Sequence, residues 1–396
     1  MCGFIGLFGD SSNTSLKKII QMSHLLNHRG PDNESFHYFS LDKNINYSFQ
    51  KDNFRKEESS LDGYFAFNRL SIQDLSPKAN QPMISNSGSV VIVFNGEIYN
   101  TVYLKEILLK KGCTFKTTSD TEILLYLYLE FGLDVALEMI DGMYAFSIVD
   151  LRNKTISIIR DHAGIKPLYY YFKNNNLIFS SELKVFNCIK ELNWELNYEK
   201  FSEQILFRNI VGQETLVRNI YQLIPGSYKI FSFSENSIKQ KIEKTFYNFP
   251  EFKQWNKYNK NKVFDLESKF KQIVYSQLVS DVPLGAQLSG GIDSSLVTFF
   301  ASENKSDIET FSINVNDLNL SEEKYINYVN NIINCKSNIY EISDNEYIDK
   351  FDRVTYFLDH PIHHPNTIGL YYLAKYSSEK FKGLISGEGA DELFAG

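Results

Sequence analysis

The sequence predicts two domains of different fold class, an α+β domain followed by an α/β domain built on a parallel sheet. Over roughly the first 190 residues, short apolar runs alternate with turn residues, and amphipathic helical patches interrupt them. From about Val263, short apolar strands and helix candidates alternate, a pattern typical of parallel strands with crossover helices. The chain has 396 residues, 43% of them hydrophobic, which is enough for two or three cores.

The first domain is expected to contain antiparallel strands joined by turns. The clearest strand candidates are Tyr144–Asp150, Thr155–Arg160, Pro167–Phe172 and Leu177–Ser180, with a turn at Arg152–Lys154. Two segments, LKKIIQMSHLLNH (16–28) and TEILLYLYLEFG (121–132), have apolar residues at the three- and four-residue spacing of helices. The Asn- and Lys-rich stretch 191–262 is expected to connect the two domains.

In the second domain the strand and helix candidates follow one another closely. They are PLGAQL (283–288), SSLVTFFASE (294–303), IETFSINV (308–315), EKYINYVNNIIN (323–334) and SNIYEI (337–342). We find no internal repeat. This order predicts a parallel sheet covered by helices.

Charge and cysteine usage narrow the class of protein. The formal net charge is −7 with both signs mixed along the chain, which gives no support to binding of nucleic acid or an anionic membrane. Four cysteines lie far apart without CxxC spacing, as expected for free thiols in a reducing cytoplasm. The first residues lack a basic signal-peptide region, and no stretch has 18 consecutive apolar residues. We therefore expect a cytoplasmic protein.

Cys2 is the first candidate nucleophile. If the initiator methionine is removed, Cys2 carries a free α-amine, whose pKa near 7.7–8.0 lets it act as a base for the adjacent thiol. Taken alone, an early cysteine more often packs as a small hydrophobic residue. Other segments have to decide between these two roles.

Six segments follow Cys2 in order: NHRGPD (27–32), NRLSIQDLSPKANQPM (68–83), FNGEIYN (94–100), TSDTE (118–122), DGMYAFSIVD (141–150) and RDHAGIKPLYY (160–170). Together with Cys2 they resemble the glutaminase domain of class II glutamine amidotransferases, in the version found in glutamine-hydrolysing asparagine synthetases. The resemblance covers residues 2–190. It implies an Ntn-hydrolase-like αββα sandwich that hydrolyses glutamine with Cys2 as the nucleophile.

The resemblance also assigns roles around the substrate glutamine. Arg69 would hold the α-carboxylate, a task suited to a bidentate guanidinium. The Asn95 side-chain amide and the Gly96 N–H would form the oxyanion hole. Glu97 and Asp120 would face the α-ammonium. The remaining glutamine-binding positions are Leu70, Ser71, Ile72 and Gln73.

A second motif, QLSGGIDSSLV (287–297), has the character of a phosphate-binding loop. Two glycines and three hydroxyls lie between a strand and a helix candidate, where backbone N–H groups can receive phosphate. The chain has no GK pair, which excludes a Walker A loop. Asp293 within the loop would repel phosphate unless a divalent cation lay between them, so it implies Mg²⁺. An ordinary Gly/Ser turn with an Asp cap is the alternative for GGxD alone.

The full string SGGIDSS resembles the pyrophosphate loop of the ATP pyrophosphatase (PP-loop) family, and LISGEGADELFAG (384–396) resembles a segment of asparagine synthetases. The resemblance implies a PP-loop domain over 263–396, with ATP as a substrate. Asp293 and Asp391 would hold Mg²⁺, and Glu388 would assist formation of an acyl-adenylate. The implied ATP-binding residues are Leu288, Ser289, Gly290, Gly291, Asp293, Ser294, Ser295, Ile313, Ser386 and Gly387. Glu392 replaces the third glycine of GxGxxG, which argues against a dinucleotide site.

The function expected from both halves is that of a glutamine-dependent asparagine synthetase. Ammonia released at Cys2 would pass through an internal passage and attack a β-aspartyl-AMP made from aspartate and ATP, which gives asparagine, AMP and pyrophosphate. Two alternatives stay open. One is a related enzyme that amidates another carboxylate, such as a sugar acid in surface polysaccharide synthesis. The other is a non-catalytic binding module.

Two departures from the family pattern bear on this choice. Synthetases of the family continue well beyond the motif that ends at Gly396, so we expect the second domain to be incomplete and synthetase activity to be in question. The segment LDHPIHHPNTIGLYYL (358–373) stands where many of them have an acidic stretch near the acceptor. Its three histidines lie among Pro361 and Pro365, which argue against a helix that would pair them on one face, and this favours a structural or substrate-shaping role over a metal site. Assembly is left open, with a homodimer as one option.

Overall fold

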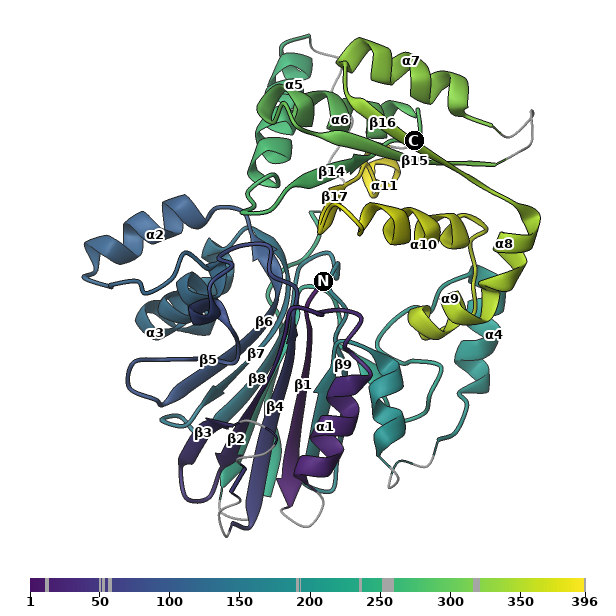
Figure 1. Ribbon diagram of the computed structural model, residues 1–396. Coiled ribbons are helices and arrows are strands. Elements are labelled where there is room, and N and C mark those ends of the chain that lie inside the picture. The colour runs from purple at the N-terminus through teal and green to yellow at the C-terminus, as the bar shows by residue number, and fades with distance from the viewer. Residues whose placement is uncertain are drawn as a thin grey trace. The chain divides into compact units, whose positions relative to one another are not determined.

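The computed structural model describes residues 1–10, 14–49, 51, 54–55, 59–189, 192, 194–234, 237–250, 260–315 and 321–394. The chain divides into two compact units, Met1–Pro250 and Glu251–Gly396. Each unit has its own sheets and its own hydrophobic clusters (Figure 1). Among the described residues, no helix combines the length and the apolar character needed to cross a membrane.

The first unit contains two antiparallel sheets. The seven-stranded sheet has the order β11-β9-β10-β1-β4-β2-β3, and the six-stranded sheet has the order β13-β12-β8-β7-β6-β5. The strands are β1 (Gly3–Asp10), β2 (Asn33–Ser40), β3 (Ile45–Phe49), β4 (Leu61–Arg69), β5 (Met83–Ile84), β6 (Val90–Ile98), β7 (Gly142–Asp150), β8 (Thr155–Arg160), β9 (Tyr169–Lys173), β10 (Asn176–Ser180), β11 (Tyr221–Gln222), β12 (Ser227–Ser234) and β13 (Ser237–Thr245).

The first unit also contains helices. They are α1 (Leu16–His24), η2 (Pro77–Ala79), α2 (Thr101–Lys110), α3 (Asp120–Met139), η3 (Leu183–Cys188) and α4 (Tyr198–Phe207). Helices α1 and η3 share a core with the seven-stranded sheet, and α2 and α3 share one with the six-stranded sheet (Figure 1). A third core fills the space between the two sheets. This αββα arrangement confirms the predicted fold class.

The two-residue alternation of the strands decides which side chain enters which core. In β1, Phe4 and Phe8 lie in the core between the sheets, whereas Ile5 and Leu7 face α1. In β6, Val91 and Val93 point inward and Ile92 faces α3. Both faces of these strands are buried, so their sequences read as nearly continuous apolar runs.

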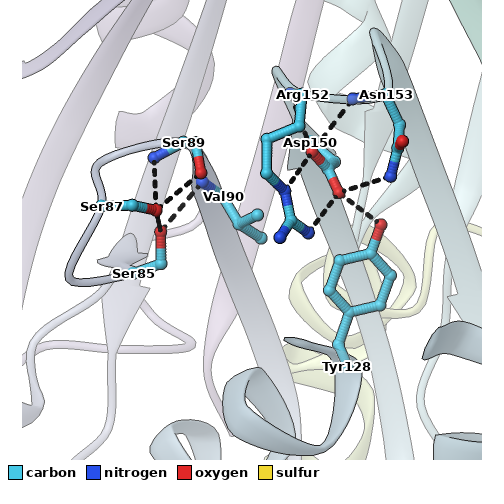
Figure 2. A network of polar contacts seen from close by, with 8 residues as sticks. All are labelled: Ser85, Ser87, Ser89, Val90, Tyr128, Asp150, Arg152 and Asn153. Carbon is cyan, nitrogen blue, oxygen red and sulfur yellow. Dashed lines mark hydrogen bonds and ion pairs between the residues drawn. The ribbon is translucent and has the colours of Figure 1, made fainter. Parts of the chain in front are cut away.

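Local sequence features begin helices and close turns. Ser119 caps α3 by accepting a hydrogen bond from the N–H of Thr121 at 3.2 Å. In the six-stranded sheet, Asp150 closes the turn between β7 and β8. It accepts hydrogen bonds from Arg152, Asn153 and the hydroxyl of Tyr128 (Figure 2). The predicted turn is therefore present.

Part of the expected connecting segment 191–262 belongs to the sheets of the first unit. Strand β12 pairs with β8 and carries β13 beyond it, and α4 also lies in this stretch. The apolar residues Tyr228, Phe231 and Phe233 are buried. Strand β13 contributes part of the polar character of the stretch, because it is exposed at the sheet edge, where charged side chains discourage pairing with another chain.

The second unit has a four-stranded parallel sheet with the order β16-β15-β14-β17. Its elements are α5 (Lys260–Ser276), β14 (Leu284–Gln287), α6 (Ile292–Asn304), β15 (Glu309–Val315), α7 (Glu323–Ile333), β16 (Lys336–Ile342), α8 (Asp344–Asp349), α9 (Phe351–Leu358), α10 (Asn366–Ser377), β17 (Gly383–Ile385) and α11 (Ala390–Phe394). Helices α5 and α6 share one hydrophobic cluster with β14, and α10 packs against residues of β15. The parallel sheet confirms the predicted α/β class.

Candidate active sites

The strand pattern brings the expected glutaminase residues to one end of the sandwich. Cys2 packs against the core between the sheets, as does Phe4 two residues later. By the same alternation, Arg69 in β4 and Asn95 in β6 fall on the inward-facing positions of their sheets, in step with Phe67 and Val93. Cys2 directly precedes β1, Arg69 ends β4 and Asn95 lies in β6, so the thiol, the guanidinium and the amide are positioned by strands of both sheets.

The β1–β4 pairing places Cys2 beside the segment that follows Arg69. Gly3 lies opposite Asn68 in the register, and the N–H of Leu70 donates a hydrogen bond to Cys2 Sγ at 3.4 Å. Burial raises the pKa of the Cys2 thiol. The thiol is thus protonated at neutral pH and needs a base before it can attack.

Arg69 is held firmly by main-chain and side-chain oxygens. Nη1 donates to Ser76 O at 3.1 Å and to Asn80 Oδ1 at 2.8 Å, and Nη2 donates to the carbonyl oxygens of Gln73 and Asp74. Each terminal nitrogen carries two hydrogens, so these four acceptors occupy both nitrogens. A bidentate contact with a glutamine carboxylate requires at least one of these hydrogen bonds to be exchanged.

Asn95 is the residue with the clearest unused donor. It is 1% exposed, and its Nδ2 has no hydrogen-bond partner among the described residues. Gly96 packs tightly against β7, because a Cβ there would come within 2.3 Å of Met143 O. Close packing of the two strands therefore requires a glycine at this position. This is a second reason for the glycine, in addition to the oxyanion-hole N–H expected from the sequence.

Glu97 and Asp120 form an acidic pair behind the amide. Glu97 accepts a hydrogen bond from the Gln73 side chain, and Asp120 Oδ2 accepts one from the N–H of Ile98 at 3.1 Å. Burial raises the pKa of both carboxyl groups, and the charge of Asp120 raises that of Glu97 further. A bound ammonium group would relieve this cost. Of the other expected glutamine contacts, the Ser71 N–H donates to Asp32 Oδ2 at 2.7 Å, and Ile72 is partly exposed beside it.

Three residues to which the sequence assigned no role lie around this site. Gln81 hydrogen-bonds to both backbone groups of Phe94 and to Thr121 Oγ1. The Arg29 guanidinium donates to the Cys2 carbonyl oxygen at 2.9 Å. Lys166 is 6% exposed, and burial lowers the pKa of its ammonium, which interacts electrostatically with Glu97. Gln81, Arg29 and Lys166 all fall within the quoted motifs, so their positions could have been flagged.

In the second unit, the two motif loops meet at a point where the strand order reverses. Strand β14 leads on to β15 on one side, and β17 pairs with its other side. The loop 288–291 follows β14, and Ser386 and Gly387 follow β17. Ligands of open α/β sheets bind outside the carboxyl ends of the strands at such a switch point.

Contacts within and between the loops organise this region. Ser289 and Ser294 join through their hydroxyls at 2.9 Å, and the Ser295 hydroxyl donates to Gly291 O at 2.6 Å. Gly387 lies against the first turn of α6, since a Cβ there would meet Ser294 N at 2.8 Å. The structure thus brings the two motifs together. Three further residues were expected at the ATP site. Leu288 is buried at the start of the loop and Gly290 lies within it. Ile313 lies on β15.

The acidic residues of the second unit lie on these same elements. Asp293 is in the first turn of α6, Asp391 is in the short α11, and Glu388 follows Gly387, where its N–H donates to Ser386 Oγ at 3.4 Å. Among the described residues, no group of three or more His, Cys, Asp or Glu side chains is arranged to hold a metal ion. The rings of His360 and His363 lie 4.9 Å apart between centroids and are tilted by 45° to each other.

Comparisons with known proteins relate each half of the chain to a family. The model described as "Glutamine amidotransferase domain" matches residues 55–247, and the one described as "Asparagine synthase" matches residues 265–396. The whole chain is 31% identical to "Asparagine synthetase (glutamine-hydrolyzing) 1" of Bacillus subtilis and spans 59% of its length.

A second relative is covered more completely. It is "Putative asparagine synthetase (glutamine-hydrolyzing) 2" of Methanocaldococcus jannaschii, 31% identical over the whole chain, which spans 75% of its length. Among solved structures, glutamine phosphoribosylpyrophosphate amidotransferase from Bacillus subtilis aligns over 78% of this chain and 65% of its own, with 18% identity and a TM-score of 0.46.

Proposed function

Because the chain belongs to the family of glutamine-hydrolysing asparagine synthetases, we propose that its first unit hydrolyses glutamine and its second unit uses ATP to activate a carboxylate for amidation. The observation that supports the first half is the buried Nδ2 of Asn95, a donor without a partner among the described residues, on a position that faces the same inner core as Cys2. A preorganised donor of this kind suits an oxyanion that forms only during the reaction.

The proposed hydrolysis begins after removal of Met1. The α-amine of Cys2 takes the thiol proton, and the sulfur attacks the side-chain amide carbon of glutamine. The resulting oxyanion accepts hydrogen bonds from Asn95 Nδ2 and the Gly96 N–H. The C–N bond then breaks, the leaving nitrogen takes the proton from the α-ammonium, and ammonia departs. Water attacks the thioester, which releases glutamate and restores the thiol.

Substrate binding in this proposal uses charge at both ends of the amino acid. Arg69 holds the α-carboxylate after exchange of one of its present acceptors, and Glu97 and Asp120 face the α-ammonium. Two carboxylates beside one cation favour free glutamine over a peptide-bound residue, whose nitrogen is neutral. Glutaminase activity of this unit is therefore expected to require the free amino acid.

In the second unit, we propose that ATP binds in the loops after β14 and β17. The hydroxyl and N–H groups of 289–295 suit phosphate oxygens, and the acyl-adenylate would form beside Glu388. Two carboxylates, Asp293 and Asp391, fit Mg²⁺, which is usually held by one or two carboxylates together with phosphate oxygens and water. The ion would neutralise phosphate charge.

Aspartate is the proposed acceptor, which would make asparagine the product. A second candidate is another carboxylate, favoured by the segment 358–373, where histidines stand in place of an acidic stretch. Action in the cytoplasm is supported by the free cysteines, and a homodimer is an option that sedimentation would test.

The experiment that tests the proposal supplies the purified chain with glutamine, Mg-ATP and aspartate, and quantifies glutamate, AMP and asparagine by mass spectrometry. Asparagine and AMP in equal amounts are expected. Cys2→Ala should abolish glutamate release, and ammonium chloride should still support AMP formation in that variant. Glutamate release that persists in Cys2→Ala contradicts the first half of the proposal, and glutamate without AMP contradicts the second half.

A further inference from the structure

After removal of Met1, Cys2 would be joined to the rest of the protein by a single peptide bond. Non-covalent contacts must therefore fix its position. Chain ends are poorly ordered unless other contacts tie them down, whereas catalytic groups need positions accurate to about 0.5 Å. Two contacts meet this need at Cys2. The N–H of Leu70 donates to Sγ, and Arg29 Nε donates to the carbonyl oxygen at 2.9 Å. The second contact holds the backbone, so it can persist while the sulfur reacts.

Arg29 is in turn held by a carboxylate far away in the sequence. Its Nη1 lies 3.0 Å from Glu182 Oε1, and the two residues are 8% and 5% exposed. Glu182 also accepts from the His28 ring at 2.8 Å and from Lys184 Nζ at 2.5 Å. One buried carboxylate therefore gathers three basic side chains around the start of the chain.

The backbone before Glu182 is joined to the same strand that follows Cys2. The N–H of Ser181 donates to Phe4 O at 3.1 Å, and the N–H of Phe4 donates to Ser181 Oγ at 3.1 Å. Glu182 thus has a fixed position relative to Cys2, because two hydrogen bonds join their neighbours. Glu182 contacts Arg29, and Arg29 contacts Cys2. Glu182 directly follows a residue hydrogen-bonded to β1, and Cys2 directly precedes β1, so both ends of this series of contacts are fixed by the same strand.

Glu182 keeps its charge in this setting. Burial raises the pKa of its carboxyl group, but the hydrogen bond from His28 and the charges of Arg29 and Lys184 outweigh burial and lower the pKa to about 2. An ionised carboxylate makes charge-assisted hydrogen bonds to a guanidinium, which are shorter and stronger than neutral ones. Arg29 is accordingly fixed in orientation.

We propose that Glu182 is a positioning residue of the glutaminase site, which fixes the nucleophile by orienting Arg29 against the Cys2 carbonyl group. The inference rests on the proposed hydrolysis of glutamine by Cys2. Among the described residues, Glu182 makes hydrogen bonds and ion pairs with none of those expected to bind glutamine, so its role concerns the rate of attack and leaves substrate affinity nearly unchanged.

Glu182→Gln tests the proposal, because it removes the charge and keeps the shape. We expect kcat for glutamine hydrolysis to fall about 10- to 100-fold, the effect of a nucleophile displaced by about 1 Å. KM for glutamine should stay within about threefold of the original value, since the contacts to the substrate are retained. Retention of kcat within about twofold would overturn the proposal.

Asp150→Asn is the matched control. Asp150 is also a buried carboxylate paired with an arginine, Arg152, at 2.7 Å (Figure 2). It is the last residue of β7 and lies opposite Val90, whereas Gly96 of the site lies opposite Tyr144, six residues earlier in β7. Both variants should lower the melting temperature, and only Glu182→Gln should lower kcat. An equal loss of kcat in both would mean that general destabilisation is the cause, and would overturn the proposal.

Hydrogen exchange gives a readout that needs no glutamine. The amides of residues 3–8 should exchange at least about tenfold faster in Glu182→Gln than in the unchanged chain, as expected for a released chain end, and Asp150→Asn should leave them unchanged. Unchanged exchange in Glu182→Gln contradicts the inference. If the unchanged chain releases no glutamate, the proposed function fails, and the exchange result still decides the inference.

Arg29→Lys provides a second variant in case Glu182→Gln does not fold. A lysine can still pair with Glu182, but it has one nitrogen and cannot also donate to the Cys2 carbonyl group from the same position. The same loss of kcat with little change in KM is expected. Full activity of Arg29→Lys would overturn the proposal.

Discussion

Asn95 carries a buried amide nitrogen that makes no hydrogen bond to any described residue. Leaving such a group unpaired costs about 1–3 kcal/mol. Oxyanion stabilisation gives a reason for this cost, because a donor already bound to a protein acceptor could not turn to a transient charge. At the residue scale, the unpaired Nδ2 of Asn95 therefore marks the place where we expect the negative charge of the oxyanion to develop.

Asn95→Ala should therefore separate activity from stability. Loss of one oxyanion donor lowers kcat by about 100- to 1000-fold, whereas little stability is lost with an amide nitrogen that has no partner. Steady-state kinetics and thermal unfolding measure the two effects. Ser147→Ala is the control, since Ser147 Oγ is another buried group without a described partner, on the neighbouring strand. If Asn95→Ala keeps its kcat, Asn95 is not an oxyanion donor.

Glu97 and Asp120 predict an unusual pH dependence of glutamine binding. The pair attracts the α-ammonium only while ionised, and burial raises the pKa of both groups above the usual value of about 4. As the pH falls from about 8 to about 5, we expect KM for glutamine to rise before exposed carboxylates would titrate. A KM that stays flat over this range contradicts the assignment.

Asp120→Asn checks the coupling between the two groups. Removing the charge of Asp120 lowers the pKa of Glu97, because the repulsion between the carboxylates disappears. The pH dependence of KM should move to lower pH in this variant, and KM at high pH should increase because one of two anionic contacts is lost. Kinetics across the same pH series measure both changes.

At the scale of elements, Gln81 completes a sheet edge that β5 leaves open. Strand β5 pairs with β6 only at Val91 and Ile92. Beyond that point, the Gln81 side chain accepts from the N–H of Phe94 at 2.6 Å and donates to its carbonyl oxygen at 3.1 Å. It also donates to Thr121 Oγ1 at 3.1 Å, which joins the strand of Asn95 to the helix of Asp120.

Gln81→Ala should destabilise the first unit by about 2–6 kcal/mol, because two buried backbone groups lose their partner. Chemical denaturation measures this loss, and kcat should fall with it, since the oxyanion strand and α3 are no longer tied together. Gln204→Ala is a matched control. Gln204 is equally buried but donates to a single carbonyl oxygen, that of Arg208, at 3.3 Å. Equal effects of the two substitutions would contradict the role given to Gln81.

In the second unit, Gly387 allows the loop after β17 to touch the first turn of α6. A Cβ at Gly387 would lie 2.8 Å from Ser294 N and 3.0 Å from the Asp293 carbonyl carbon, both of them backbone atoms. Gly387→Ala should push the two loops apart and weaken ATP binding by at least about tenfold, an effect of 1.4 kcal/mol. Gly369→Ala, where a Cβ would meet only Ile313 Cγ2 at 3.6 Å, should bind ATP normally. Calorimetric titration compares them, and equal affinities contradict the contact.

Periodicity predicted the elements well where apolar residues dominate. The strands of the first unit from β7 to β10 and the alternating elements of the second unit lie close to their predicted bounds. Periodicity did not predict the strands within 191–262. An edge strand such as β13 is polar on nearly every residue, so its sequence resembles that of a linker. Helix α3 is kinked at Gly132, whose φ of 78° is not helical, so the predicted helix 121–132 matches the part of α3 before the kink.

At the scale of the whole chain, the glutaminase site depends on pairings between distant strands. Motif order named Cys2, Arg69, Asn95 and Asp120, because each belongs to a recognisable string. It could not name Glu182, whose partner Arg29 lies 153 residues earlier. A single buried carboxylate has no periodic signal, and only the antiparallel order β10-β1-β4 brings it beside the start of the chain.

The measurement that tests the central claim most directly is covalent labelling of the nucleophile. A glutamine analogue that carries a diazoketone in place of the amide alkylates the thiol that attacks it. Peptide mass spectrometry of the labelled protein should find the adduct on an N-terminal Cys2 that has lost Met1, in an amount that matches the loss of glutaminase activity. Loss of activity with the adduct on another residue, or glutamate release from chains that retain Met1, would contradict the assignment of Cys2 as the nucleophile.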